Sequence, residues 1–231
     1  MRAAALALLA AALTACGGGG DSGLTVFAAS SLADVLPQID GAAHYSFGGS
    51  DELAAQIREG APADVYASAS PKYPGELHAA GLAGPPKVFA TNRLVVITRE
   101  GYAGDLASLS KPGTKVVLAA EGVPAGDYAR QALAALHMQA ALDNVVSEGD
   151  DVKGVVSKVS LGEADAGFVY ATDAKAVAGK VHVLDVPASA QPRIAYSVAV
   201  VHESGPADDF VRLLRGPDGR RALSNAGFGP P

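Results

Sequence analysis

The chain has 231 residues, of which 49% are hydrophobic and 18% are charged, and its formal net charge is −6. This apolar content excludes a disordered protein, and the length is sufficient for two compact lobes. The sequence contains no cluster of lysine and arginine. A nucleic-acid partner is therefore excluded, because such a protein needs a basic surface to neutralise phosphates.

Residues 1–15 (MRAAALALLAAALTA) place one arginine before an apolar segment, which is typical of a secretory signal peptide. The segment is too short to span a bilayer as a mature helix. Cys16, the one cysteine of the chain, follows in the string LTAC, which resembles the processing site of bacterial lipoproteins. That resemblance implies that Cys16 is an acylated membrane anchor and that residues 16–23 are a glycine-rich tether. A buried free cysteine is the alternative.

From residue 24 onwards, short apolar runs typical of strands alternate with patterns typical of amphipathic helices. The predicted strands are 24–29, 44–47, 63–68, 93–98, 115–120, 165–170, 181–186 and 194–201. The predicted helices are 31–39, 51–60, 71–81, 124–138, 151–162, 206–216 and 219–228. This alternation predicts an α/β fold built on parallel sheets. Because Pro37 deletes a backbone hydrogen bond, we expect the first helix to be short.

Four predicted strand-to-helix turns carry small or hydroxyl residues, at 30–31, 48–50, 124–126 and 150–152. A helix start leaves amide N–H groups unpaired and carries a partial positive charge, so it is a ready site for an anion. Small residues let a ligand approach that backbone closely. Each turn alone indicates no more than a helix cap, since every α/β protein has such turns, but four together favour an anion site.

The residue patterns of common enzymes and metal sites do not occur in the sequence. The histidines are far apart and lack the spacing of metal ligands: His44, His78, His137, His182 and His202. The run 48–50 (GGS) is followed by Asp51 where a serine hydrolase needs glycine, and no phosphate-binding loop occurs. Three carboxylate pairs, at 51–52, 150–151 and 208–209, fall in predicted first helical turns, where acids favour the helix dipole. We expect neither an enzyme nor a cofactor.

Seven strings, taken in order, resemble the molybdate-binding receptors of bacterial ABC transporters: TVFAASSL, FGGSDELAAQI, GAPADVYASA, VPAGDYARQAL, GDDVKGVV, GFVY and YSVAVV. The resemblance runs from Leu24 to Phe228. It implies the type II periplasmic binding-protein fold, with two α/β lobes that each hold a mixed, mostly parallel sheet flanked by helices. The implied lobes are residues 24–91 with 197–231, and residues 92–196. The implied two-strand hinge lies near Thr91-Asn92 and Tyr196-Ser197.

Carried over position by position, the resemblance implies a molybdate site between the lobes. Ser31 and Ser50 would supply hydroxyl and amide donors from the first lobe. Ala125 and Val152 would supply backbone N–H groups from the second lobe, and Tyr170 its phenol. A site made only of donors suits a fully ionised dianion such as molybdate or the near-identical tungstate, whereas a monoprotonated phosphate also needs an acceptor. Sulfate should be rejected by its size.

The resemblance further implies a monomeric, extracytoplasmic lipoprotein that delivers its ion to a membrane permease driven by an ATPase. Asp51 departs from the family pattern, which has a neutral residue there more often, and an acid beside Ser50 could weaken binding or turn to solvent. Three alternatives remain at this point: a receptor for another oxyanion or a small organic anion, a serine-based hydrolase, and an envelope lipoprotein without a ligand.

Overall fold

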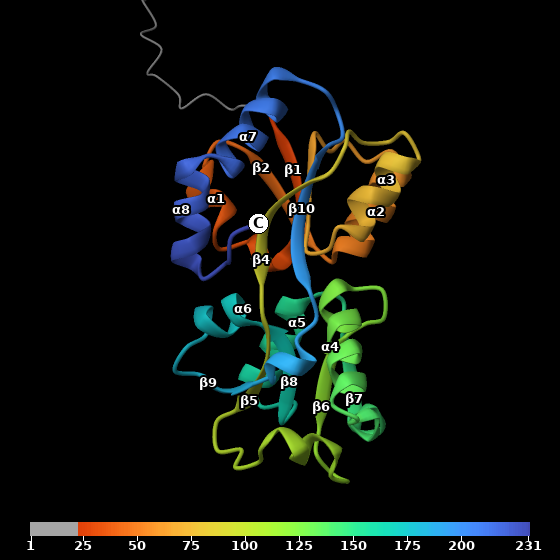
Figure 1. The fold of residues 1–231 in the computed structure, drawn as a ribbon, viewed down its shortest axis with the longest axis vertical. Helices are drawn as coiled ribbons and strands as arrows, with labels where there is room; N and C mark the ends of the chain where they lie inside the picture. The colour runs from red at the N-terminus through yellow and green to blue at the C-terminus, as the bar shows by residue number, and fades with distance from the viewer. Residues whose placement is uncertain (1–22) are drawn as a thin grey trace, which may run out of the picture.

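The computed structural model describes residues 23–231, and Figure 1 shows them as two lobes, each with a sheet flanked by helices. The predicted signal peptide (1–15), the predicted anchor Cys16 and nearly all of the predicted tether lie outside the described residues. Within residues 23–231, no helix combines the length and the apolar character that a membrane span requires.

The sheet of the first lobe has the strand order β2-β1-β3-β10-β4. Its strands are β1 (Thr25–Ala29), β2 (His44–Gly48), β3 (Val65–Ser68), β4 (Lys87–Asn92) and β10 (Ile194–Val200). β1 pairs in parallel with β2 and β3, and β10 is antiparallel to both of its neighbours. Figure 1 shows helices on both sides of this sheet. They are α2 (Ser50–Arg58) and α3 (Lys72–Ala79), opposite α1 (Leu36–Ile39), α7 (Gly205–Arg215) and α8 (Pro217–Ala226).

The sheet of the second lobe repeats this plan with the order β7-β6-β8-β5-β9. Its strands are β5 (Leu94–Arg99), β6 (Val116–Ala119), β7 (Val145–Gly149), β8 (Ala166–Tyr170) and β9 (Val181–Asp185). β6 is parallel to β7 and β8, while β5 is antiparallel to β8 and β9. The helices are α4 (Pro124–Ala135), α5 (Val152–Ser160) and α6 (Ala171–Ala176), with short 3₁₀ turns η2 (Leu106–Ser110), η3 (Gln139–Asn144) and η4 (Ala188–Ala190). In each sheet one strand runs against the other four, which confirms the expected mixed, mostly parallel architecture.

Two neighbouring strands carry the chain between the lobes. β4 leads through Arg93 into β5, and β10 brings the chain back to the first sheet (Figure 1). β4 and β10 form an antiparallel pair that runs from Asn92 opposite Ile194 to Lys87 opposite Val198. Their register shifts between Tyr196 and Ser197. These are the segments in which we expect the hinge.

The prediction of a single helix over residues 31–39 is wrong. The chain instead forms a 3₁₀ turn, η1 (Ser30–Leu32), and then the short helix α1. Pro37 is the physical reason, because it has no N–H to bond to the carbonyl one turn earlier. Ser31 therefore lies in a three-residue turn and not at the start of a full helix. The strands β4 and β7, the helix α6 and the 3₁₀ turns η2, η3 and η4 were not predicted.

Candidate functional site

A small cavity lies between the lobes. Residues of the first lobe line it from the ends of β1, β2 and β3, and residues of the second lobe line it from the starts of α4 and α5 and the end of β8. The lining residues are Ala29, Ser30, Ser31, Gly48, Gly49, Ser50, Ala69, Val123, Pro124, Ala125, Asp151, Val152 and Tyr170. All five residues predicted to bind the ligand are among them. The structure thus brings together positions that are up to 139 residues apart, between Ser31 and Tyr170.

The two predicted serine donors are buried at the cavity and each has a defined hydrogen-bond partner. The Ser50 Oγ accepts a hydrogen bond of 3.1 Å from the backbone N–H of Ala69, so its own proton stays available for the cavity. The Oγ of Ser31 lies 2.8 Å from the hydroxyl of Tyr196 on β10. Because Ser50 is the first residue of α2, its backbone N–H also lacks an intrahelical partner.

Two helices of the second lobe, α4 and α5, begin at the cavity. Ala125 is the second residue of α4 and Val152 is the first residue of α5, so neither N–H has a carbonyl one turn back to bond. The side chain of Asp151 accepts the N–H of Gly154 at 2.8 Å and so caps α5 while leaving the N–H of Val152 free of that contact. Gly126 lets α4 pack closely against the end of β6, since a Cβ at this position would lie 2.2 Å from the carbonyl oxygen of Ala119.

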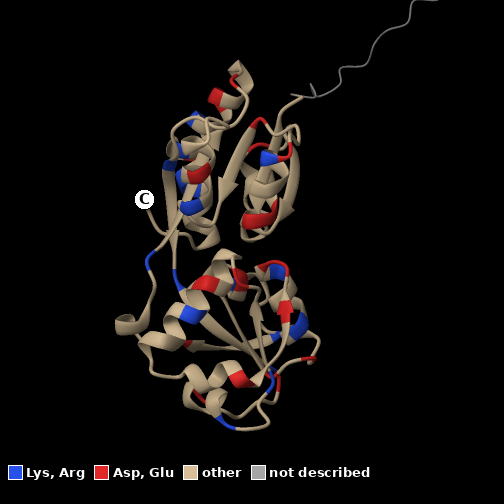
Figure 2. Ribbon diagram, turned by 90° about the vertical axis from the view of Figure 1, so that its right-hand side faces the viewer, with Lys and Arg blue, Asp and Glu red and all other residues tan. Residues whose placement is uncertain are grey.

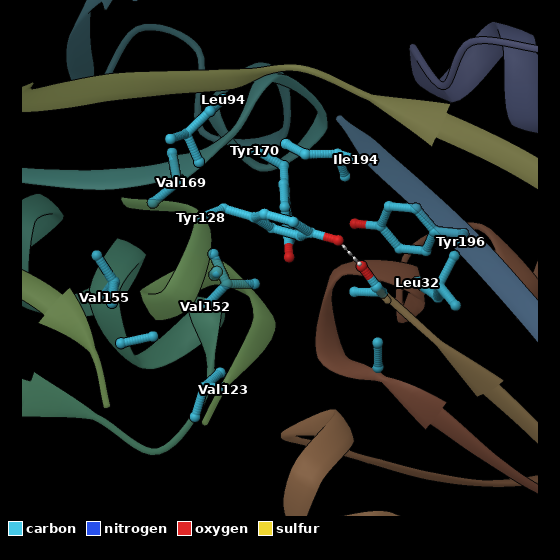
Figure 3. Packing of buried hydrophobic residues seen from close by; sticks show 14 of the residues in the cluster. Leu32, Leu94, Val123, Tyr128, Val152, Val155, Val169, Tyr170, Ile194 and Tyr196 are labelled. Carbon is cyan, nitrogen blue, oxygen red and sulfur yellow. Dashed lines mark hydrogen bonds between the residues drawn. The ribbon is translucent and has the colours of Figure 1, made fainter. Parts of the chain in front are cut away.

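Tyr170 ends β8, and its hydroxyl is buried without a hydrogen-bond partner in the part of the chain described. Its ring contacts Tyr128 and Tyr196 edge to face, with centroid separations of 6.5 and 5.7 Å (Figure 3). Burial raises the pKa of Tyr170 well above its ordinary value, so the group is a neutral donor. An unsatisfied buried phenol costs free energy, and an anion in the cavity would supply the missing acceptor.

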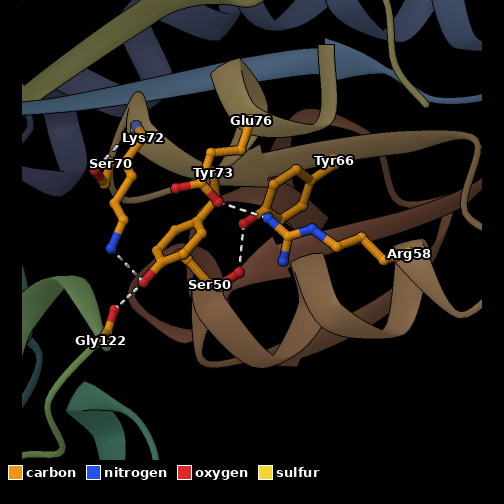
Figure 4. Close-up of polar contacts among 8 residues, drawn as sticks. All are labelled: Ser50, Arg58, Tyr66, Ser70, Lys72, Tyr73, Glu76 and Gly122. Carbon is orange, nitrogen blue, oxygen red and sulfur yellow. Dashed lines mark hydrogen bonds and ion pairs between the residues drawn. The ribbon is translucent and has the colours of Figure 1, made fainter. Parts of the chain in front are cut away.

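Three polar contacts join the lobes around the cavity. The Tyr73 hydroxyl on α3 donates to the carbonyl of Gly122 and accepts from the Lys72 amine (Figure 4). Across the same cleft, the Tyr128 hydroxyl lies 3.5 Å from the Ala69 carbonyl oxygen (Figure 3). These contacts show that the described conformation has its lobes closed on each other.

The third contact is an ion pair backed by a buried acid. Lys153 Nζ of the second lobe lies 2.6 Å from Asp34 Oδ2 of the first lobe and 3.6 Å from Asp173 Oδ1. Asp173 is fully buried, and that burial raises its pKa from 3.8 to about 7 although Lys153 opposes the shift. The Lys153 cation is thereby shared between two carboxylates at the edge of the cleft.

The cavity itself has no basic side chain among its described lining residues. Figure 2 shows Lys and Arg interspersed with Asp and Glu along the ribbon of both lobes. An anion here would be held by hydroxyls, N–H groups and helix starts alone. Such donors can stabilise an anion without a buried counter-charge, since hydrogen bonds to a charged group are about twice as strong as neutral ones.

Asp51, the departure from the family pattern, does not line the cavity. It lies in the first turn of α2, and burial raises its pKa, with a smaller contribution from Asp127 of the other lobe. Its Oδ1 is buried with no hydrogen-bond partner within residues 23–231. The sequence left two outcomes for Asp51, weaker binding or a side chain turned to solvent. The buried Oδ1 means that the side chain does not simply turn to solvent.

The carboxylate pairs follow the helix-start interpretation only in part, since Asp209 lies beyond the first turn of α7. Glu52 and Asp208 lie in first helical turns, as predicted. Asp151 is instead the N-cap of α5, and Asp150 precedes it, because the cap needs an extended backbone and a side-chain acceptor. In the part of the chain described, no group of three or more His, Cys, Asp and Glu side chains could hold a metal ion.

Apart from Tyr170, sequence reasoning missed the tyrosines that surround the site. Tyr128 and Tyr73 bridge the lobes, and Tyr196 contacts a predicted ligand serine. Tyr128 and Tyr196 were present in the quoted strings VPAGDYARQAL and YSVAVV, but their spacing from the serines carries no periodic signal. Only the fold, which crosses between lobes at β10, brings Tyr196 beside Ser31.

Two lobes that close over a small cavity with hydrogen-bond donors from both sides define a solute receptor. The similarity of this chain to known proteins agrees with that class. Residues 24–229 match the family described as bacterial extracellular solute-binding protein, and the chain belongs to this family. This confirms the expectation of a binding protein in place of an enzyme, and it supports a location outside the cytoplasm.

Curated relatives and solved structures of this family are similar over most of the chain. The molybdate-binding protein ModA of Mycobacterium tuberculosis H37Rv is 36% identical over 254 residues, covering 97% of this chain and 95% of the relative. ModA of Escherichia coli K12 is 32% identical over 228 residues, covering 89% and 88%. The structure of the Azotobacter vinelandii periplasmic molybdate-binding protein matches with a TM-score of 0.81 at 26% identity, covering 90% of this chain and 99% of that one.

Proposed function

We propose that this protein is an extracytoplasmic receptor that binds molybdate between its lobes, and that it holds tungstate about equally well. The observation that carries the proposal is the cavity, into which both lobes direct donors and whose described lining residues include no basic side chain. Ser31, Ser50 and Tyr170 would donate from hydroxyls. Ala125 and Val152 would donate from backbone N–H groups at two helix starts.

The five candidate ligand groups are all donors, which supports a fully deprotonated dianion over a protonated one. Asp151, the one carboxylate among the described lining residues, is engaged in capping α5. Phosphate keeps a proton at neutral pH and would need an acceptor, which hydroxyls already committed as donors do not offer. The starts of α2, α4 and α5 add partial positive charge from both lobes. Among oxyanions of this class, the 36% and 32% identity to molybdate-binding proteins supports molybdate.

We also propose how the bound ion is delivered. Cys16 would be acylated after removal of residues 1–15, and 16–23 would tether the receptor to the membrane. Residues 24–91 with 197–231 and residues 92–196 would close on the ion as two lobes. Because donors from both lobes meet the ion only in the closed state, the ion favours closure. The loaded monomer would then pass molybdate to an ABC permease and its ATPase.

The proposal is tested by thermal unfolding of the protein with molybdate, tungstate, sulfate and phosphate added separately. A ligand at a thousand times its dissociation constant adds about 4 kcal/mol to stability, which raises the melting temperature visibly. We expect shifts with molybdate and tungstate only. A shift with sulfate or phosphate in their place would contradict the choice of ion, and no shift with any of the four would contradict the oxyanion site and direct the search to small organic anions.

Two variants connect that shift to the site. Ser31→Ala and Ser50→Ala should each lower molybdate affinity by about tenfold or more, because each removes a hydrogen bond to a charged group. Ser157→Ala, on the exposed face of α5, is the matched control and should bind as the wild type does. Unchanged affinity in both site variants would contradict the assignment of the serines.

A further inference from the structure

Tyr196 is a fully buried residue of the crossover strand β10, at the point where its register with β4 shifts. Its ring is packed edge to face against Tyr170 (Figure 3) at a centroid separation of 5.7 Å. It packs in the same way against Phe89 and Phe228, at 6.1 and 5.2 Å. Contacts on several sides leave the ring a single position. The hydroxyl of Tyr196 is therefore a fixed point between the first lobe and the second.

That hydroxyl lies 2.8 Å from the Oγ of Ser31, a buried contact between residues 165 positions apart. By distance alone, either oxygen could be the donor. Once an anion occupies the cavity, the number of protons determines which oxygen is the donor, because each hydroxyl has a single proton to donate. If Ser31 donates to the anion, only Tyr196 can supply the proton between the two oxygens.

The reverse arrangement is unfavourable for an anion. If Ser31 donated to Tyr196, the lone pairs of Oγ would face the negative charge in the cavity. Burial raises the pKa of Tyr196 well above its ordinary value, and the nearby Asp173 raises it further. Tyr196 therefore keeps its proton, and remains able to donate, over the whole physiological pH range.

We propose that Tyr196 is a positioning residue for the ligand: its hydroxyl donates to Ser31 and so holds the Ser31 proton directed at the oxyanion. This inference rests on the proposed function and extends it to selectivity. A Ser31 hydroxyl held as a donor discriminates against oxyanions that carry a proton. Without the Tyr196 hydroxyl, Ser31 can rotate and offer a lone pair to a protonated anion.

The test is a double-mutant cycle on molybdate affinity, measured by titration calorimetry of wild type, Tyr196→Phe, Ser31→Ala and the double variant. Tyr196→Phe keeps the packed ring and should lower affinity about five- to tenfold, the usual effect of one buried hydrogen bond. In the Ser31→Ala background the same change should cost nothing further, because the group that Tyr196 positions is gone.

A second measurement separates positioning from a general structural effect. The ratio of phosphate to molybdate dissociation constants should fall in Tyr196→Phe, since the freed Ser31 hydroxyl can accept from phosphate. Tyr45→Phe is the control: its hydroxyl donates to the carbonyls of Leu36 and Asp40 in the first lobe, outside the cavity lining, and it should leave both affinity and ratio unchanged.

The outcomes distinguish this inference from the proposed function. If the wild type binds molybdate but Tyr196→Phe equals it, or costs as much in the Ser31→Ala background, the inference alone is overturned. If the wild type binds only sulfate or phosphate, the choice of ion is overturned and the same cycle with that ion decides the role of Tyr196. If the wild type binds none of these anions, both fall.

Discussion

At the scale of single residues, the candidate site uses two chemically different kinds of donor. Ser31, Ser50 and Tyr170 would donate from hydroxyls, which can rotate and therefore need neighbours to orient them. Ala125 and Val152 would donate from backbone N–H groups, whose direction is set by the helix itself. A side-chain substitution can thus remove a hydroxyl donor without disturbing the backbone, whereas removal of an N–H donor requires a substitution that changes the backbone itself.

Proline at position 152 removes one N–H donor while keeping its helix. Val152 is the first residue of α5, the position at which proline is best tolerated, and Asp151 before it has the extended backbone that a following proline requires. Val152→Pro should lower molybdate affinity by about tenfold or more, as expected for a hydrogen bond to a charged group. Calorimetric titration measures the loss, with circular dichroism to verify the fold.

Val152→Ala is the matched control, because it shortens the same buried side chain but keeps the N–H. It should bind molybdate close to wild-type affinity. Equal affinity in Val152→Pro and Val152→Ala would show that the backbone of residue 152 does not contact the ion.

At the scale of elements, the site consists of strand-to-helix turns that approach one another across the cleft. Gly49, the N-cap of α2, lies so close to the second lobe that a Cβ would be 2.7 Å from the carbonyl oxygen of Asp150. Its backbone angles, φ −62° and ψ 136°, suit any residue. The glycine is therefore needed for the close approach of the lobes and not for its own conformation.

Gly49→Ala should consequently hinder closure. Within the first lobe the added Cβ would also lie 2.8 Å from Asp51 Oδ1, the end of a side chain, whose rotation relieves that contact. We expect molybdate affinity to fall about tenfold while the melting temperature of the ligand-free protein stays within a few degrees of wild type, because an open form relieves the contact. Gly75→Ala, where a Cβ would meet nothing within 4 Å, is the control. Wild-type affinity in Gly49→Ala would mean that the lobes do not close this tightly on the ion.

The elements that the sequence predicted well are those with a strong local signal. α2 and α5 follow glycine and aspartate, and α4 begins with proline, residues that mark helix boundaries through their own backbone preferences. β7 was missed because its burial alternates weakly along VVSEG, and β4 because its first residues are exposed. α6 has only six residues and no side-chain cap. The antiparallel placement of β5 and β10 depends on long-range pairing, which no local pattern encodes.

The same distinction applies to the site. The five ligand candidates followed from a resemblance in ordered motifs, and their convergence on one cavity agrees with it. The contact between Tyr196 and Ser31 joins residues on different elements through the return of β10, so neither spacing nor composition could indicate it. Lys153, Asp34 and Asp173 form their cluster for the same reason, through contact between the lobes.

At the scale of the whole molecule, closure brings a cation and two carboxylates together at the edge of the cleft. Asp173 is fully buried beside Lys153, and it faces Asp34 of the first lobe and Tyr196 of the crossover strand β10. Its pKa of about 7 means that the folded protein retains a proton that the unfolded chain releases near 3.8. Stability from this group is therefore fully present below the lower value and is lost as the pH rises through the upper one.

Asp173→Asn should remove this dependence, because asparagine does not titrate. The difference in melting temperature, variant minus wild type, should rise between about pH 4 and pH 7 and level off above that range. Thermal unfolding at a series of pH values measures it, and the comparison with wild type cancels the titration of other groups. A difference that is constant over this range would show that Asp173 has an ordinary pKa.

The most direct test of the central claim is a crystal structure of the protein with molybdate, in which anomalous scattering locates the molybdenum atom. The account predicts one peak in the cavity between the lobes, with oxygen atoms of the ion about 2.7–3.1 Å from donors of Ser31, Ser50, Ala125, Val152 and Tyr170. A peak elsewhere, or an ion held by lysine or arginine side chains, would contradict it.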